Sequence, residues 1–138
     1  MQKLYKGVLF AEDDEDDRVL FEDAVKESFP NISMTGYDRC ENLLQDLMGS
    51  ILNLPELIFL DLNMPGMNGL DCLRAIRESA KFKHIPVIML STSSSEMNIK
   101  ESMSLGANGY ITKPSSFLQL RTVLEKSISE FVDRVHLI

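Results

Sequence analysis

Five short apolar runs, separated by segments with helical spacing, constrain the fold of this chain more than any other feature. The apolar runs are residues 7–11, 32–37, 56–61, 86–91 and 109–112. The helical segments are residues 14–28, 41–48, 68–78 and 96–105, and a last one that begins at Ser116. Strands that alternate with helices through short loops predict a parallel sheet with right-handed crossovers and helices on both faces. We therefore expect an α/β fold of the doubly wound, flavodoxin-like type, with five strands in the order 2-1-3-4-5.

Individual segments add detail to this prediction. The run 86–91 is almost wholly apolar, which indicates a strand covered on both faces, whereas the alternating run 32–37 suits an edge. Gly106 suits the left-handed position that follows a helix. In the first helix, the core side is expected to carry Leu20, Ala24 and Phe29. In the last helix, an apolar stripe is expected at Phe117, Leu120, Leu124, Phe131 and Val135.

Composition restricts the class of protein. The 138 residues suit one domain, so we expect a single domain over residues 1–138 without an output domain. A net charge of -7 and the absence of a basic run argue against nucleic acid as a partner. No run approaches the roughly 20 apolar residues of a membrane span. Cys40 and Cys72 lack metal-ligand spacing and are expected to be free, buried thiols, which favours a cytoplasmic location.

Charged residues stand at the ends of several predicted strands. Asp61 ends the third strand, Glu12 and Asp13 follow the first, and Lys113 follows the fifth. Ser91 ends the fourth strand. The carboxyl ends of parallel strands share one rim, and the first and third strands flank the switch point where such sheets bind ligands. We expect these side chains to form one site.

The residue types indicate the chemistry of this site. Converging carboxylates raise one another's pKa, and a hard cation with oxygen ligands, most simply Mg²⁺, relieves that conflict. Asp61 beside such a cation is a candidate nucleophile towards phosphorus, with Lys113 neutralising the transferred group and Ser91 donating a hydroxyl. Each residue alone has an ordinary explanation; the acids at 13–17, for example, could simply cap a helix. Because four strand ends each carry a residue suited to this chemistry, their coincidence favours a site over the separate ordinary explanations.

Four segments of the chain strongly resemble the receiver domain of two-component response regulators. They are FAEDDEDD (10–17), LIFLDLNMPGMNGLD (57–71), IPVIMLSTSS (85–94) and GANGYITKP (106–114). The likeness covers almost the whole chain. Its layout is similar to stand-alone receivers of the chemotaxis or phytochrome-associated type, which work with histidine kinases.

The resemblance implies a role for each site residue. Asp61 would be the phosphoacceptor, with catalytic help from Lys113 and Ser91. Mg²⁺ would be held by the metal group Glu12, Asp13, Asp61 and Asn63, with Asn63 using its backbone carbonyl and Glu12 acting mainly through water. Ser91 and Tyr110 would be the switch residues. In this family the Lys113–Pro114 peptide bond is often cis.

The resemblance also implies partners and leaves alternatives. The expected donor is a sensor histidine kinase or a phosphotransfer protein, and the expected output is a changed surface of the fourth helix, fifth strand and fifth helix for a downstream protein. Catalysis would extend only to the protein's own phosphorylation and dephosphorylation. The apolar segment 132–138 suggests a homodimer. The alternatives are a Mg²⁺-dependent phosphatase of the haloacid dehalogenase type, a flavodoxin-like FMN carrier, and a receiver-like binding module that works without phosphorylation.

Overall fold

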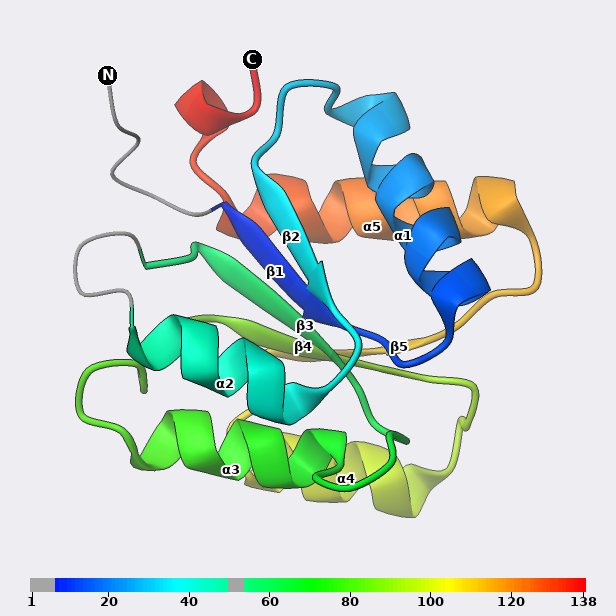
Figure 1. Cartoon of the computed structure of the whole chain (residues 1–138). Helices are drawn as coiled ribbons and strands as arrows, with labels where there is room; N and C mark the ends of the chain where they lie inside the picture. The colour runs from blue at the N-terminus through cyan, green and yellow to red at the C-terminus, as the bar shows by residue number, and fades with distance from the viewer. Residues whose placement is uncertain (1–6, 50–53) are drawn as a thin grey trace.

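A single parallel sheet organises the molecule. The computed structural model describes residues 7–49 and 54–138. Within them the strands pair in the order β2-β1-β3-β4-β5, as the alternation of segments predicts (Figure 1). The strands are β1 (Val8–Ala11), β2 (Met34–Tyr37), β3 (Leu57–Asp61), β4 (Val87–Ser91) and β5 (Gly109–Thr112). The partly exposed β2 is an edge strand, as expected.

Helices cover both faces of this sheet. They are α1 (Glu15–Ser28), α2 (Cys40–Met48), α3 (Gly69–Glu78), α4 (Glu96–Ser104) and α5 (Phe117–Phe131), followed by a short 3₁₀ helix η1 (Arg134–His136). Figure 1 shows α1 and α5 on one face and α2, α3 and α4 on the other. None of the helices in the described part of the chain is long and apolar enough to cross a membrane.

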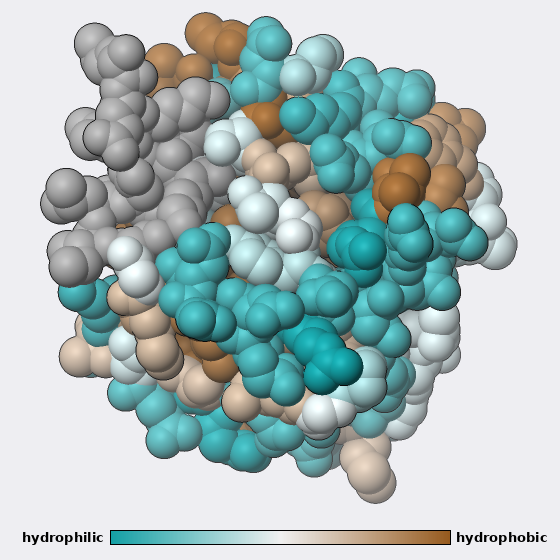
Figure 2. All heavy atoms as spheres, in the orientation of Figure 1, coloured by the Kyte–Doolittle hydropathy of each residue, from teal (hydrophilic) through white to brown (hydrophobic). Residues whose placement is uncertain are grey.

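The core has two parts because strand side chains alternate between the faces. In β1, Leu9 joins the cluster under α2 and α3, while Phe10 joins the cluster under α1 and α5. The strands β1, β3 and β4 are buried along their whole length. Their carboxyl ends therefore form a rigid rim. The face that carries β2, α1 and α2 is mostly hydrophilic, with apolar atoms in small separate patches (Figure 2).

Polar caps set where the helices begin. The side chains of Asp14, Asn68, Ser95 and Ser116 each accept a hydrogen bond from the backbone N–H three residues later. A capping residue stands outside the helix that it starts, so several helices begin one residue later than the spacing predicts.

Three predicted core positions are wrong. Phe117, at the start of α5, is 39% exposed. Leu20 is 45% exposed, and the buried side chains of α1 are Phe21, Ala24 and Val25. Val135 does not lie on α5, because the helix ends at Phe131. Val132 is extended and the Asp133 side chain caps η1, which turns the chain away from the helix axis.

The C-terminal segment folds against its own domain. Val132 is buried and Leu137 packs on the core cluster under α1 and α5. The carboxylate of Glu56, just before β3, pairs with His136 and accepts the backbone N–H of Asp133 at 3.0 Å. Part of the apolar segment is therefore used within the molecule.

Candidate functional site

The acidic side chains meet at the carboxyl ends of the two central strands. Asp61 is the last residue of β3, and Glu12 follows β1, which pairs with β3 in register. The backbone N–H of Glu12 donates to the carbonyl of Tyr37 at 2.9 Å, which extends the sheet by one bond and aims the Glu12 side chain at the rim. One carboxylate oxygen from each of Glu12, Asp13 and Asp61 lies within 4.8 Å of the others. The predicted acidic group is therefore assembled.

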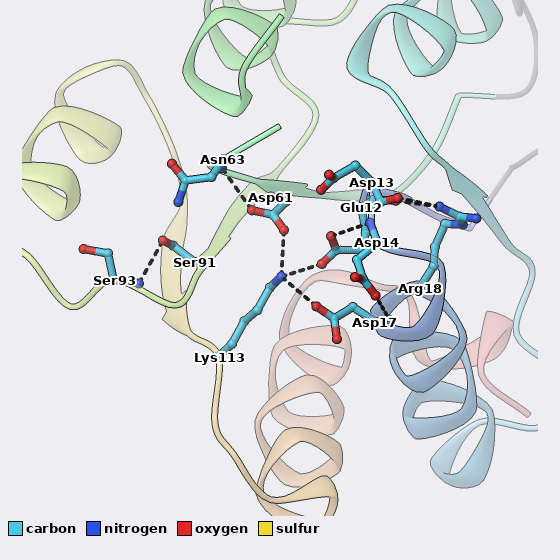
Figure 3. A network of polar contacts seen from close by, with 10 residues as sticks. All are labelled: Glu12, Asp13, Asp14, Asp17, Arg18, Asp61, Asn63, Ser91, Ser93 and Lys113. Atoms are coloured by element: carbon cyan, nitrogen blue, oxygen red, sulfur yellow. Dashed lines mark hydrogen bonds and ion pairs between the residues drawn. The ribbon is translucent and has the colours of Figure 1, made fainter. Parts of the chain in front are cut away.

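Lys113 reaches this group from the end of β5 (Figure 3). Its Nζ lies 2.7 Å from Oδ2 of Asp61 and forms an ion pair with Glu12. The backbone supports this reach, because the N–H of Lys113 donates to the carbonyl of Ser91 at 2.7 Å. One ammonium group thus bridges the carboxylates of two different strands.

Burial makes the electrostatics of the site unusual. Glu12 and Asp61 are 4% and 5% exposed. Burial raises the pKa of Glu12 to about 7; the hydrogen bond from Lys113 opposes this shift and the neighbouring Asp61 adds to it. Burial lowers the pKa of Lys113, but its hydrogen bonds and charge interactions with Asp61 and Glu12 outweigh that effect, so the net shift is upward. Lys113 therefore stays charged, but its single positive charge does not balance the three carboxylates of the acidic group.

These residues fit a divalent cation. The donors are carboxylate oxygens, which hard cations prefer, and Asp13 is exposed, which leaves space for retained water. The group could bind a metal ion, and its oxygen-only chemistry suits Mg²⁺ and Mn²⁺ alike.

The loops beside Asp61 hold the remaining predicted residues. Asn63 donates its backbone N–H to Oδ1 of Asp61 at 3.0 Å. Ser91 is fully buried, and its Oγ accepts the backbone N–H of Ser93 at 3.0 Å. The hydroxyl of Tyr110 donates to the carbonyl of Ser93 at 2.8 Å. Both candidate switch residues therefore hold the same peptide segment after β4.

Three residues of this region were not assigned to the site from the sequence. Asp17, which looked like a simple first-turn acid of α1, has its Oδ2 3.8 Å from Nζ of Lys113. Arg18 donates to the carbonyl of Glu12 at 2.9 Å and so orients the acidic loop. Ser93 links the two switch residues. For Asp17 and Arg18, the only signal in the sequence was a position one helical turn from the acidic pair. The sequence held no signal for the contacts of Ser93.

The peptide bond before Pro114, a candidate for the cis form from the family resemblance, is trans. The described residues contain no cis peptide bond. The trans form of an X–Pro bond is favoured by about 0.5–1 kcal/mol, and here Lys113 reaches both carboxylates with the bond trans.

Comparison with known proteins agrees with this fold. The family model of the response regulator receiver domain matches residues 8–125. The chain therefore belongs to the response regulator receiver domain family.

Individual relatives lie within the same family. Chemotaxis protein CheY of Pseudomonas aeruginosa is 39% identical over 71 residues, which cover 51% of this chain and 57% of that protein. The match thus spans little more than half of that relative. The crystal structure of a phosphorylated cyanobacterial phytochrome response regulator, RcpA, superposes with a TM-score of 0.84 at 28% identity, covering 94% of this chain and 95% of RcpA. A Mn²⁺-bound form of response regulator Rcp1 gives 0.81 at 28% identity, covering 96% and 99%.

Proposed function

We propose that this protein is a phospho-accepting response regulator and that Asp61 is the residue phosphorylated. The observation that carries the proposal is the meeting of Glu12, Asp13 and Asp61 with Lys113 at one rim of the sheet. Receiver domains interact with histidine kinases or phosphotransfer proteins, and RcpA has been crystallised in its phosphorylated form. A phosphohistidine of such a partner is the donor in this proposal.

In the proposed transfer, a carboxylate oxygen of Asp61 attacks phosphorus while the bond from phosphorus to the histidine nitrogen breaks. The imidazole leaves with the electron pair of that bond and takes a proton from solvent. Nζ of Lys113, now 2.7 Å from Oδ2 of Asp61, neutralises charge on the transferred group. The burial of Asp61 limits competing water.

Mg²⁺ is the cofactor in this proposal. Glu12, Asp13 and Asp61 would hold it, with the backbone carbonyl of Asn63 as a further ligand. When bound, it would supply positive charge to the phosphoryl oxygens. The Mn²⁺-bound form of Rcp1, a structural neighbour of this chain, supports the binding of a divalent ion.

The output in this proposal is a changed protein surface. A phosphoryl group on Asp61 adds strong acceptors that Ser91 and Lys113 can bind, which draws Ser91 away from Ser93. Tyr110, bonded to Ser93, responds to the same movement. Met97 and Met103 on α4 and Phe117 and Leu118 on α5 are exposed, so the α4–β5–α5 side offers apolar area to a downstream protein.

Catalysis in this proposal is limited to the protein's own phosphorylation and dephosphorylation, and the location is cytoplasmic. A homodimer is also proposed; among the apolar side chains after α5, Val135 and Ile138 are the exposed ones that could contact a second copy. Sedimentation of the full chain and of a chain lacking residues 133–138 tests that contact. The same number of chains per particle for both would contradict a role of this segment in dimerisation.

The phosphoacceptor is tested by intact-mass spectrometry after incubation with acetyl phosphate and Mg²⁺. Wild type is expected to gain the mass of one phosphoryl group, and Asp61→Asn to gain none. Asp16→Asn is the matched control, because Asp16 is an exposed acid of α1 and the charge change is the same. A stable phosphorylated form of Asp61→Asn would overturn the assignment. No gain by wild type with any donor would favour the binding module that works without phosphorylation.

A further inference from the structure

Helix α4 is held by less apolar packing than the other helices. Ser102 is its one buried residue, and α4 lies wholly within the described part of the chain. Its Met97 and Met103 are 75% and 46% exposed. By contrast, α3 buries Gly69, Cys72, Leu73 and Ile76. Segments with few buried apolar contacts open and shift most easily, so the polar contacts at the ends of α4 decide its position.

The N-terminal end of α4 is tied to the side chain of Ser93. Oγ of Ser93 accepts the backbone N–H of Ser95 at 3.1 Å and Nδ2 of Asn98 at 3.0 Å. Ser95 in turn caps the helix by accepting the backbone N–H of Asn98. The position of the first turn of α4 therefore depends on the position of Ser93.

The backbone of Ser93 is tied to both candidate switch residues. Its N–H donates to Oγ of Ser91, and its carbonyl accepts the hydroxyl of Tyr110. Four hydrogen bonds thus converge on one residue, two through the backbone towards the site and two through the side chain towards α4.

The C-terminal end of α4 is tied elsewhere. Arg77 of α3 donates through Nε to the carbonyl of Gly106 at 2.9 Å and through its guanidinium to Oδ1 of Asn108 at 2.9 Å. The same guanidinium donates to the carbonyl of Ile85 at 2.8 Å. Gly106 has φ +101°, a conformation that suits glycine and sharply ends the helix. This end has no direct contact with the switch residues among the described hydrogen bonds.

We propose that Ser93 is the positioning residue through which the state of Asp61 reaches α4. When Ser91 turns its hydroxyl towards a phosphoryl group, it releases the N–H of Ser93, and Oγ of Ser93 carries the first turn of α4 with it. Arg77 keeps the other end in place, so the helix tilts about Gly106. This inference rests on the proposed phosphorylation of Asp61 and adds how the change leaves the site.

The structure has room for such a tilt. A polar hollow of about 440 Å³ lies between the loop after β3 and the start of α4. It is lined by Leu62, Asn63, Met64, Asn68, Leu70 and Asn98. Asn98 can therefore move next to Asn63 without displacing the core.

The test uses ¹⁵N-labelled full chain with beryllofluoride and Mg²⁺ as the phosphoryl mimic. The backbone amide of Asn63, which is hydrogen-bonded to Asp61, reports binding of beryllofluoride at the site. The backbone amides of residues 96–99 report movement of α4. In wild type both sets are expected to shift, with larger changes at residues 96–99 than at residues 102–105. In Ser93→Ala the shift at Asn63 persists, while the shifts at 96–99 shrink by roughly threefold or more, as expected when a coupling contact is removed.

Matched variants make the result specific. Ser93→Thr keeps the hydroxyl and is expected to restore the α4 shifts. Ser94→Ala changes the exposed neighbouring serine and is expected to behave as wild type. Asn98→Ala removes the other partner of the Ser93 side chain and should reproduce the loss in a second, independent variant.

The outcomes separate this inference from the proposed function. If the α4 shifts in both Ser93→Ala and Asn98→Ala are as large as in wild type, the role of Ser93 is overturned. The assignment of the phosphoacceptor would then stand. Absence of any shift at Asn63 in wild type would overturn the proposed function, and this inference with it.

Discussion

Nζ of Lys113 lies 2.7 Å from Oδ2 of Asp61 although the two residues are 52 positions apart in the chain. The same ammonium group pairs with Glu12, so two buried carboxylates depend on one lysine. Removal of one partner of a buried pair costs far more than the pair contributes, because the remaining charge has no compensation.

Lys113→Met is therefore expected to lower the free energy of unfolding by about 3–5 kcal/mol when metal is chelated. Added Mg²⁺ should restore part of the loss, so the rise in the unfolding midpoint with Mg²⁺ should be larger than in wild type. Urea unfolding followed by circular dichroism measures both. Lys81→Met, at an exposed loop lysine, is the control and should show neither effect. Equal midpoints for Lys113→Met and wild type in chelator would contradict this account of the site.

Gly69 allows α3 to start directly behind Asp61. A Cβ at this position would lie 2.3 Å from the backbone oxygen of Asp61 and 2.9 Å from Cα of Leu62. Gly69→Ala is expected to cost about 1–3 kcal/mol or more through backbone displacement, and to slow phosphorylation because Asp61 moves.

Gly49→Ala is the matched control for that substitution. The nearest atoms to a Cβ at Gly49 are 3.6 Å away, and its φ of -79° suits alanine. A change there should be neutral or stabilising by about 0.4–1 kcal/mol, because alanine reduces the entropy of the unfolded chain. Similar losses for both glycines would show that the close approach at Gly69 is unimportant.

Phe21 and Leu20 are neighbours in α1 with opposite environments. The ring of Phe21 lies 4.3 Å from that of Phe10 and 5.1 Å from that of Phe59, measured between centroids. Phe21→Ala is expected to cost about 3–5 kcal/mol in unfolding free energy. Leu20→Ala should change it much less, because this side chain is 45% exposed. Thermal and urea unfolding of the two variants gives the comparison, and a larger loss for Leu20→Ala would contradict the orientation of α1.

Tyr37 should give the protein a pH-dependent stability at alkaline pH. Burial and the hydrogen bond to the Asp46 carboxylate raise the pKa of its phenol well above the ordinary value of 10.0. Above that ordinary value the folded state holds the proton more strongly than the unfolded state, so the free energy of unfolding falls as pH rises. Tyr37→Phe should reduce that slope. Urea midpoints between pH 9 and 11, roughly the range in which unfolded tyrosine titrates, measure it; identical slopes would contradict the role of Tyr37.

The elements, their order and the rim that carries the site all follow from the pattern of residues along the chain. The spacing of apolar residues, and the turn residues between the runs, located five strands and five helices. The strands of a parallel sheet all place their carboxyl ends at the same rim. Glu12, Asp13, Asp61 and Lys113 could therefore be grouped from the sequence, because each ends or follows a strand of the same parallel sheet.

The contacts between individual side chains depend on the packing of the folded chain. The buried side of α1 depends on how α5 and the sheet pack against it, so Phe21 rather than Leu20 lies in the core. Asp17 reaches Lys113 because α1 starts beside the end of β5 in space, which no local spacing records. Ser93 joins Ser91, Tyr110 and Asn98 through bonds that depend on the path of one loop. Periodicity acts over a few residues, whereas these contacts are selected by packing across the whole chain.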